Sequence, residues 1–343
     1  MMLVLGLAAG LWGLGWLLRV PVALRLAALA VLWAAIILAH LVLPEGAGLR
    51  QTLGGSAAGW AVLGGAAGLV LIYAIGLKHL KARTTPAASE EGPFRQAELD
   101  RYSRHILLRE IGGPGQMRLK SAKVLVIGAG GLGSPALLYL AASGVGTLGV
   151  IDDDRVEGSN LQRQIIHSDQ RIGMAKTQSA EIAVKALNPF VEVRPYQRRL
   201  DAEIAEALIA EYDLVLDGTD NFDTRYLVNR TCAKLGKPLI AGAMTQWEGQ
   251  LSLYDPAHGT PCYECVFPER PLPGMVPACA EAGVAAPLPG IIGAMMAMEA
   301  VKHLTGAGET LAGRLLIHDA LYAESRVIAV KRRAGCAACG AMH

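Results

Sequence analysis

The sequence predicts an α/β protein in which a doubly wound domain with a mostly parallel sheet follows three transmembrane helices. Three observations predict this organisation. Long apolar runs fill most of the chain before Lys78. An aliphatic run at residues 123–127 precedes a glycine-rich turn and a helical stretch, which is the order of a strand, a phosphate-binding turn and a helix. Two Cys-x-x-Cys pairs in the last third of the chain predict a four-cysteine zinc site.

The composition divides the chain into unequal parts. Of its 343 residues 52% are hydrophobic, and the mean hydropathy of +0.34 is high for a soluble enzyme. The net charge is only +2, from 32 basic and 30 acidic residues, so we expect no nucleic-acid partner. Six cysteines, four of them in Cys-x-x-Cys pairs, indicate metal in a reducing compartment. We expect a membrane anchor (residues 1–83), a linker (84–96) and a cytoplasmic catalytic domain (97–343).

The membrane anchor is predicted to contain three transmembrane helices. Three apolar stretches occur, at residues 1–18, 26–43 and 53–77. Each can cross about 30 Å of hydrocarbon as a helix. The first also suits a cleaved signal peptide, but no basic segment precedes it and another apolar run follows at once. In the third, Gly64 and Gly68 have the spacing of a close helix contact, although glycine is common in membrane helices generally.

Basic residues predict the orientation of this anchor. Arg19 and Arg25 lie between the first two apolar stretches, and three further basic residues follow the third: Lys78, Lys81 and Arg83. Positively charged loops remain on the cytoplasmic side, so both groups are placed there and residues 44–52 face outward. We therefore expect a multi-pass protein of the inner or plasma membrane with its catalytic domain in the cytoplasm.

A glycine-rich turn marks the candidate nucleotide site. The sequence Gly-Ala-Gly-Gly-Leu-Gly at residues 128–133 precedes the helical stretch 134–142. Glycines let the backbone approach phosphates closely, and the helix that follows offers unpaired N–H groups to the anion. The glycines assigned to this role are Gly128, Gly130, Gly131 and Gly133.

An acidic triplet follows the second predicted strand, residues 147–151. Asp152 and Asp154 lie about twenty residues beyond the glycines, where a carboxylate binds ribose hydroxyls. Asp153 lies between them and is expected to point away from both, into solvent. This pattern fits NAD and ATP equally.

Residues further along the chain favour ATP. Arg163 and Lys176 can neutralise a triphosphate, and Asn160 can hydrogen-bond it. Asp220 follows the predicted strand at residues 214–216 and can hold Mg²⁺ through water molecules. Each residue alone is more often a surface charge or a helix cap, but a hydride-transfer enzyme has no need of the combination.

Five motifs occur together in the region after the linker. They are Arg-Tyr-Ser-Arg-His at residues 101–105, the glycine turn, Ser-Asn-Leu-Gln-Arg-Gln at 159–164, Thr-Asp-Asn at 219–221 and the paired cysteines. Together they resemble the ThiF/MoeB/HesA family, relatives of ubiquitin-activating enzymes, over residues 97–339. The resemblance implies a Rossmann-like, dimeric domain that binds ATP. The ATP-binding positions that it implies are Gly131, Asp152, Asn160, Arg163, Lys176 and Asp220, together with Ser159 and Asn221 of the same motifs.

Arg104 has a separate role by this resemblance. It would reach the phosphates of the ATP bound by the other subunit of a homodimer. The alternative is a salt bridge on an amphipathic helix at residues 97–110.

The paired cysteines predict a metal site. Cys262 and Cys265 form one pair and Cys336 and Cys339 the other, a spacing that suits a closed Cys₄ zinc site with no open water position, which is therefore structural. Two unrelated reduced pairs are the alternative. Cys232 lies in a helical segment and is expected to be a buried, inert thiol.

Cys279 lies in a Pro- and Gly-rich segment, residues 271–290. By the resemblance it occupies a Cys-x-x-Ala-Gly-Val position that in ThiF-like members attacks the acyl adenylate or a persulfide, while other members do without it. Both readings stay open. The stretch at residues 287–304, with three methionines, is predicted to be a core or dimer helix.

The resemblance implies ATP-dependent adenylation of the C-terminal glycine of a small ubiquitin-like sulfur-carrier protein ending in Gly-Gly, of the molybdopterin- or thiamin-synthesis type. The expected cofactors are ATP, Mg²⁺ and Zn²⁺. No sulfurtransferase domain follows Cys339, so we expect a separate sulfur donor. An adenylating dehydratase acting on a modified tRNA base is the nearest alternative, and the zinc pairs and the missing basic patch disfavour it. Arg163, Lys176 and Asp220 disfavour an NAD-dependent oxidoreductase and a non-catalytic membrane scaffold.

Overall fold

The computed structural model describes residues 2–84, 92–271 and 282–340. The chain divides into two compact units, Met1–Glu91 and Gly92–His343. Most of the predicted linker, residues 85–91, and the predicted nucleophile Cys279 lie outside the described residues.

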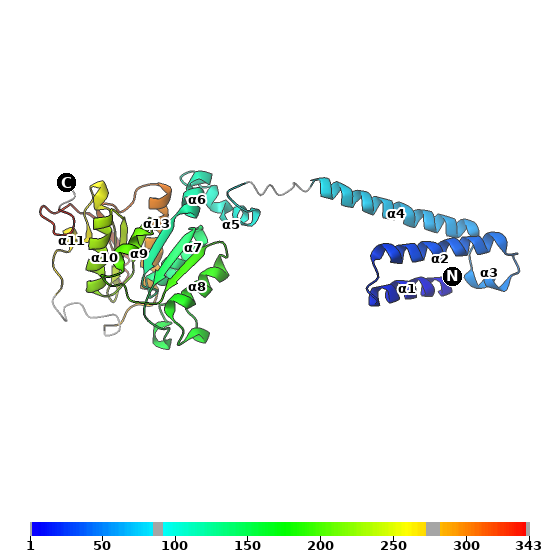
Figure 1. Cartoon of the computed structure of the whole chain (residues 1–343), viewed down its shortest axis with the longest axis horizontal. Coiled ribbons are helices and arrows are strands. Elements are labelled where there is room, and N and C mark those ends of the chain that lie inside the picture. The colour runs from blue at the N-terminus through cyan, green and yellow to red at the C-terminus, as the bar shows by residue number, and fades with distance from the viewer. Residues whose placement is uncertain (1, 85–91, 272–281, 341–343) are drawn as a thin grey trace. The chain divides into compact units, whose positions relative to one another are not determined.

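In the described part of the N-terminal unit all regular secondary structure is helical (Figure 1). Its helices are α1 (Met2–Leu17), α2 (Val22–Val42), α3 (Gly48–Leu53) and α4 (Ala57–Thr84). Among the described residues two segments are long and apolar enough to cross a membrane, Val22–Val42 and Ala57–Leu77, and Leu3–Leu17 forms a shorter apolar helix. The prediction of three such spans was therefore wrong in number.

The first helix is too short because the backbone turns at its C-terminal end. Arg19 adopts a positive φ of 53°, which ends the helix there. At about 1.5 Å per residue, Leu3–Leu17 spans roughly 22 Å, less than the ~30 Å of hydrocarbon. The third predicted span also begins later than expected, because Gly54 and Gly55 both have positive φ.

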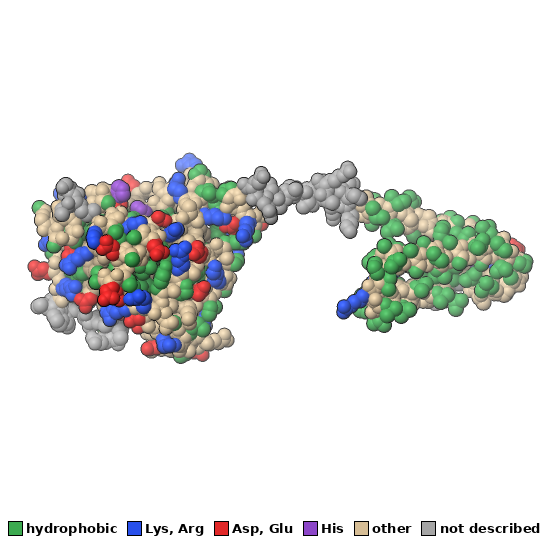
Figure 2. All heavy atoms as spheres, in the orientation of Figure 1, with side chains coloured by type: hydrophobic (Ala, Val, Ile, Leu, Met, Phe, Trp, Pro, Cys, Tyr) green, Lys and Arg blue, Asp and Glu red, His purple; other side chains and the backbone are tan. Residues whose placement is uncertain are grey.

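The apolar side chains of this unit face mostly outward. Hydrophobic atoms cover its visible face in Figure 2, and only 6% of each long apolar segment is buried. Its small interior includes Ile36, Leu53 and Trp60. The Trp33 indole N–H donates to the Trp60 carbonyl at 2.7 Å, and a Cβ on Gly64 would lie 2.1 Å from the Trp33 ring. Gly64 thus permits the close helix contact predicted for it.

The C-terminal unit is built around one eight-stranded sheet with the order β3-β2-β1-β4-β5-β6-β7-β8. Its strands are β1 (Lys123–Ile127), β2 (Thr147–Ile151), β3 (Glu192–Tyr196), β4 (Leu214–Asp217), β5 (Leu239–Met244), β6 (Glu248–Tyr254), β7 (Arg314–Asp319) and β8 (Glu324–Ala329). Strands β1 to β5 are parallel, and β5 through β8 pair antiparallel. The α/β class and the mostly parallel sheet are confirmed.

Helices cover both faces of the sheet. They are α5 (Gln96–Ile106), α6 (Gly112–Ser121), α7 (Gly133–Ser143), α8 (Lys176–Leu187), α9 (Ala205–Ala210), α10 (Phe222–Leu235), α11 (Tyr263–Val266) and α13 (Pro287–Thr305), with 3₁₀ turns at Gly158–Asn160, Asp169–Arg171 and Pro256–His258. Alternate residues of β1 enter two different cores: Val124 and Val126 pack in one, Leu125 and Ile127 in the other. Burial on both faces explains why β1 is a continuous aliphatic run. The predicted methionine helix, α13, packs in the first core through Ile292 and Met296.

The strand order positions the functional site. The chain leaves β1 toward β2 on one side and later returns to place β4 on the other. The carboxyl ends of β1, β2 and β4 therefore meet where the order reverses, and ligands of open α/β sheets bind in that crevice.

Candidate functional site

A cavity of about 350 Å³ lies at the reversal point of the sheet. Nine of the predicted site residues line it: Gly128, Gly130, Gly131, Asp152, Asp154, Arg163, Lys176, Asp220 and Asn221. Gly133, Ser159 and Asn160 lie next to lining residues without lining the cavity themselves. Arg104 is exposed on α5 and does not line it.

The glycine turn is shaped by two close approaches. Gly128 has φ +91°, a conformation that favours glycine, and a Cβ on Gly133 would lie 1.8 Å from the Gly128 carbonyl oxygen. Any larger residue at position 133 would therefore open the turn. Gly133 acts through backbone packing, not through contact with the cavity.

Asp152 fixes the turn to the end of β2. Its Oδ2 accepts a hydrogen bond from the Ala129 N–H, and its Oδ1 accepts one from the Asp154 N–H, both at 2.8 Å. Burial raises the pKa of this carboxyl, while nearby Lys176 opposes that rise. Each oxygen keeps a lone pair for a further donor such as a ribose hydroxyl.

Two cations enter the cavity from separate segments. Lys176 begins α8, is buried, and pairs with Asp154 through Nζ and Oδ2 at 2.6 Å. Arg163 donates from Nη2 to Asn160 Oδ1 at 3.0 Å and from Nη1 to the Ser159 carbonyl at 3.4 Å. Asn160 and Ser159 therefore orient Arg163, a different arrangement from the direct contact expected of them.

Sequence reasoning missed two further cations, Arg198 and Arg199. Both line the cavity just beyond β3. Arg198 pairs with Asp201 at 3.2 Å, and Arg199 makes no ion pair among the described residues. The available signal was a basic pair one residue beyond β3, the strand that follows the acidic triplet in the chain.

The loop after β4 presents Asp220 to the cavity. Asp217, the last residue of β4, anchors this loop. Its Oδ1 accepts hydrogen bonds from the Thr219 N–H at 2.9 Å and from the Thr219 hydroxyl at 2.6 Å. Arg225 on α10 pairs with Asp217 Oδ2 at 3.6 Å and donates to the carbonyls of Thr219 and Gly242 at 2.5 and 2.9 Å. Both charged side chains are buried, 0% exposed for Asp217 and 5% for Arg225.

The two predicted residues of this loop, Asp220 and Asn221, have different roles. Asn221 caps α10, since its Oδ1 accepts the Thr224 N–H at 2.8 Å. Asp220 is exposed and makes no ion pair within the described part of the chain. It is therefore available to a cation. Sequence reasoning missed Asp217 and Arg225, although an aspartate closing a buried strand was a visible signal.

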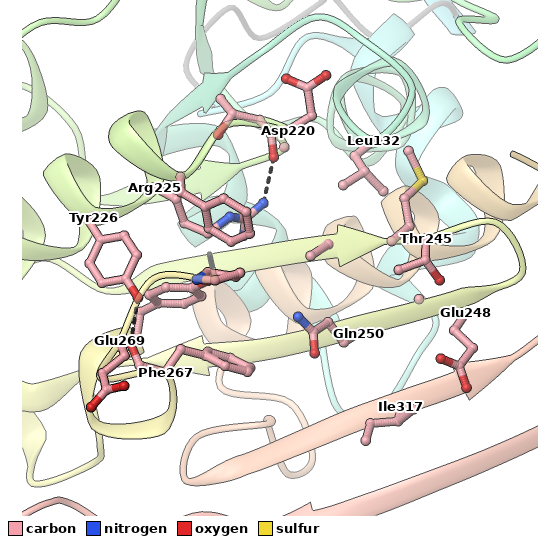
Figure 3. A pocket seen from close by; sticks show the side chains of 18 residues that line it. Leu132, Asp220, Arg225, Tyr226, Thr245, Glu248, Gln250, Phe267, Glu269 and Ile317 are labelled. Carbon is pink, nitrogen blue, oxygen red and sulfur yellow. Dashed lines mark hydrogen bonds between the residues drawn. The ribbon is translucent and has the colours of Figure 1, made fainter. Parts of the chain in front are cut away.

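A second cavity of about 460 Å³ adjoins the first. The two share five lining residues: Leu132, Gly218, Thr219, Asp220 and Met244. Figure 3 shows Asp220, Tyr226 and Phe267 around this second cavity. Most of its walls are apolar or aromatic, so the arrangement joins a charged nucleotide-sized cavity to an apolar slot at Asp220.

The four predicted metal ligands lie together and are buried. Cys262 Sγ lies 3.8 Å from Cys265 Sγ and 3.6 Å from Cys336 Sγ, and Cys265 Sγ lies 3.5 Å from Cys339 Sγ. The edge of a tetrahedron with Zn–S bonds of ~2.3 Å is about 3.8 Å. The Asn229 amide donates to Cys262 Sγ at 3.8 Å, an orienting contact of the kind that metal ligands receive. The cluster therefore fits zinc.

The fifth described cysteine has a different environment. Cys232 is buried on α10 in the hydrophobic core, and burial raises the pKa of its thiol. It has the properties expected of an unreactive thiol.

Comparison with known proteins identifies the family. Residues 102–338 match the ThiF family model. The chain is 50% identical over 251 residues to the sulfur carrier protein adenylyltransferase of Thermus thermophilus, covering 72% of this chain and 93% of that protein. It is 49% identical over 243 residues to the SAMP-activating enzyme E1 of Haloferax volcanii, covering 71% and 89%. The probable adenylyltransferase/sulfurtransferase MoeZ of Mycobacterium tuberculosis is 48% identical over 250 residues, and the chain covers 64% of its length.

Solved structures agree with this assignment. The structure of E. coli MccB with ATP superposes with a TM-score of 0.61 at 25% identity, covering 70% of this chain and 74% of that one. MccB with MccA-N7isoASN gives a TM-score of 0.62 over the same coverage. With a family match over residues 102–338 and relatives near 50% identity, this chain belongs to the ThiF family.

Proposed function

We propose that this protein is an ATP-dependent adenylyltransferase that activates the C-terminal carboxylate of a small ubiquitin-like sulfur-carrier protein ending in Gly-Gly. One observation carries the proposal: the charged cavity and the apolar slot share Asp220 and its loop. A nucleotide in the first and a peptide tail in the second would meet there. Relatives named sulfur carrier protein adenylyltransferase and SAMP-activating enzyme support this substrate class.

In this proposal the cavity binds ATP by its charges. The glycine turn donates backbone N–H groups to phosphate oxygens, and Asp152 accepts hydrogen bonds from the ribose. Arg163 and Lys176 balance the phosphate charge. Lys176 exchanges its contact with Asp154 for a phosphate oxygen, since both are anionic partners for the same ammonium group.

The reaction is nucleotidyl transfer. A carboxylate oxygen of the carrier's terminal glycine forms a bond to the α-phosphorus, and the bond from that phosphorus to the pyrophosphate oxygen breaks. No general base is required because a carboxylate is ionised at neutral pH. Asp220 would hold Mg²⁺ through water molecules at the junction of the cavities, and the ion would neutralise charge on the leaving pyrophosphate.

The slot suits a tail without side chains. Phe222, Tyr226, Tyr263 and Phe267 line it, and the Tyr263 and Phe267 ring centroids lie 4.9 Å apart. These two rings pack against each other as one wall of the slot, and an extended Gly-Gly segment can lie along such a wall because it brings no side chain. The carrier would feed molybdopterin or thiamin synthesis, with sulfur supplied by a separate donor protein, and Cys279 remains a proposed nucleophile for a later step.

We also propose a homodimer in which Arg104 completes the partner's site. Arg104 is exposed on α5, lies outside its own cavity, and makes no ion pair within the described ranges. On α13, Met298 is 60% exposed and Ile291 37%, which offers apolar surface for a second copy.

Membrane tethering through the N-terminal unit is part of the proposal. If α2 and the apolar part of α4 span the membrane, both ends of the pair lie on one side. Arg19 precedes α2, Arg25 lies in its first turn, and basic residues follow Leu77. The positive-inside rule then places the catalytic domain, residues 97–343, in the cytoplasm whatever the position of α1. The anchor is residues 1–83 and the linker 84–96. The cysteine cluster would hold a structural Zn²⁺.

The test is exchange of radioactive pyrophosphate into ATP by the full chain in detergent. Exchange should require a Gly-Gly-ending carrier, since adenylate formation is reversible. Asp220→Asn should reduce exchange at least about 100-fold, whereas Asp169→Asn, an exposed residue outside both cavities, should not. Carrier-independent exchange, exchange that requires tRNA, or NAD reduction in its place would refute the assignment.

A further inference from the structure

A buried histidine connects three walls of the nucleotide cavity without lining it. His167 is 7% exposed. Its Nε2 lies 2.9 Å from the Ala129 carbonyl oxygen in the glycine turn. Its Nδ1 lies 2.9 Å from the Ser179 hydroxyl on α8. His167 itself follows Arg163 by four residues in the chain, so one imidazole contacts the turn, the arginine segment and the lysine helix.

The hydrogen bonds define the state of this ring. A carbonyl oxygen only accepts, so Nε2 carries the proton and donates to Ala129. Burial lowers the pKa of His167 to about 4, and the charges of Lys176 and Arg171 act in the same direction. The neutral ring leaves Nδ1 as an acceptor, and the Ser179 hydroxyl donates to it. Nε2 is therefore the hydrogen-bond donor and Nδ1 the acceptor.

These contacts determine where the Gly130 N–H points. In a trans peptide the C=O and the next N–H point in opposite directions. Because His167 binds the Ala129 carbonyl, the Gly130 N–H points away from His167. Gly130 lines the cavity, and in the described part of the chain its N–H makes no hydrogen bond. On the other side of Ala129, its own N–H donates to Asp152 Oδ2. Both peptide groups that flank Ala129 are therefore fixed.

We propose that His167 is a positioning residue for phosphate binding: through the Ala129 carbonyl it aims the Gly130 N–H into the nucleotide cavity and keeps the turn in register with Arg163 and Lys176. This inference rests on the ATP-binding part of the proposed function and not on the identity of the carrier. It assigns a task to a residue that touches no substrate.

Two matched variants separate the two hydrogen bonds. The amide nitrogen of His167→Gln reaches the Nε2 position and can still donate to Ala129. The amide of His167→Asn reaches only the Nδ1 position, so it keeps the Ser179 contact and leaves the Ala129 carbonyl unpaired. Ser179→Ala removes the contact to α8 and leaves the bond to Ala129.

The measurement is calorimetric titration of the full chain in detergent with Mg-ATP, followed by pyrophosphate exchange. We expect His167→Asn to weaken ATP binding about tenfold, the loss of roughly one hydrogen bond to a charged ligand, and to raise KM for ATP more than it lowers kcat. His167→Gln and Ser179→Ala should remain within about threefold of the unchanged protein.

Four outcomes are decisive. Unchanged ATP affinity in His167→Asn would overturn the inference. Equal weakening in the Asn and Gln variants, together with equal falls in melting temperature, would show a role in stability alone. If the unchanged protein binds ATP but shows no carrier-dependent exchange, the proposed function fails while the comparison of variants still decides the role of His167. If it binds no ATP, both are overturned.

Discussion

Replacing Arg225 with methionine tests how the loop that carries Asp220 is held. Arg225→Met keeps much of the side-chain volume and removes the charge. Asp217 then stays fully buried without its cationic partner, and its Oδ2 has no other hydrogen-bond partner among the described residues. Breaking a buried ion pair on one side costs about 3–5 kcal/mol. The carbonyls of Thr219 and Gly242 also lose a donor.

This cost should appear as a large thermal shift. For a domain of this size each kcal/mol lowers the melting temperature by about 2–4 °C, so Arg225→Met should melt roughly 10 °C below the unchanged protein. In the double variant Asp217→Asn/Arg225→Met the buried charge is absent, and the asparagine oxygen can still accept the Thr219 N–H. It should therefore recover about half of the loss.

Circular dichroism melting in detergent and pyrophosphate exchange are the assays. Exchange should fall in Arg225→Met because the loop no longer presents Asp220 at the junction of the two cavities. A single variant that melts within about 2 °C of the unchanged protein, or a double variant no more stable than the single one, would refute the reasoning.

Three other perturbations have defined outcomes. Cys336→Ser should abolish stoichiometric zinc in metal analysis and lower the melting temperature, whereas Cys232→Ser should keep the metal; retention of zinc without Cys336 would show that the two cysteine pairs are independent. Because the pKa of His167 is lowered from 6.5 to about 4, its contribution to stability is complete above pH 6.5 and is lost as the pH falls toward 4, where the unfolded chain binds the extra proton. Urea midpoints of His167→Gln should therefore vary less with pH across that window than those of the unchanged protein, and parallel curves would contradict this. A reporter fused at Gly46 should be external and one at the C-terminus cytoplasmic; the reverse would separate the catalytic domain from cytosolic ATP.

The glycine turn and Asp152 could be predicted because each follows a buried strand directly, and Asp220 because it lies in the loop that begins at the end of β4. The carboxyl ends of neighbouring parallel strands meet, so local sequence determines where these residues lie. The cysteine cluster could also be predicted, because pair spacing and metal geometry restrict the arrangement.

Other contacts depend on tertiary pairing that local sequence does not encode. Arg198 and Arg199 reach the cavity only because β3 pairs with β2 in register. The link from His167 to Ala129 joins residues 38 apart, and no periodicity predicts it. In the N-terminal unit, hydropathy alone predicted that the first apolar stretch spans the membrane like the other two. The positive φ of Arg19 ends its helix too early for that.

The short helix α11 has a consequence for how this protein can vary over evolution. Tyr263 lies between Cys262 and Cys265, and its ring lies 5.5 Å from that of Tyr226 and 4.9 Å from that of Phe267 in the apolar slot. Helix α11 thus attaches the C-terminal tail, through the cluster that joins its cysteines to Cys336 and Cys339, and also forms part of the wall of the slot. A substitution that loosens the tail also reshapes the slot, while the nucleotide cavity, which contains none of these residues, is unaffected. Lineages that change their acceptor should therefore show coordinated substitutions in α11 and the tail, with the phosphate-binding segments unchanged.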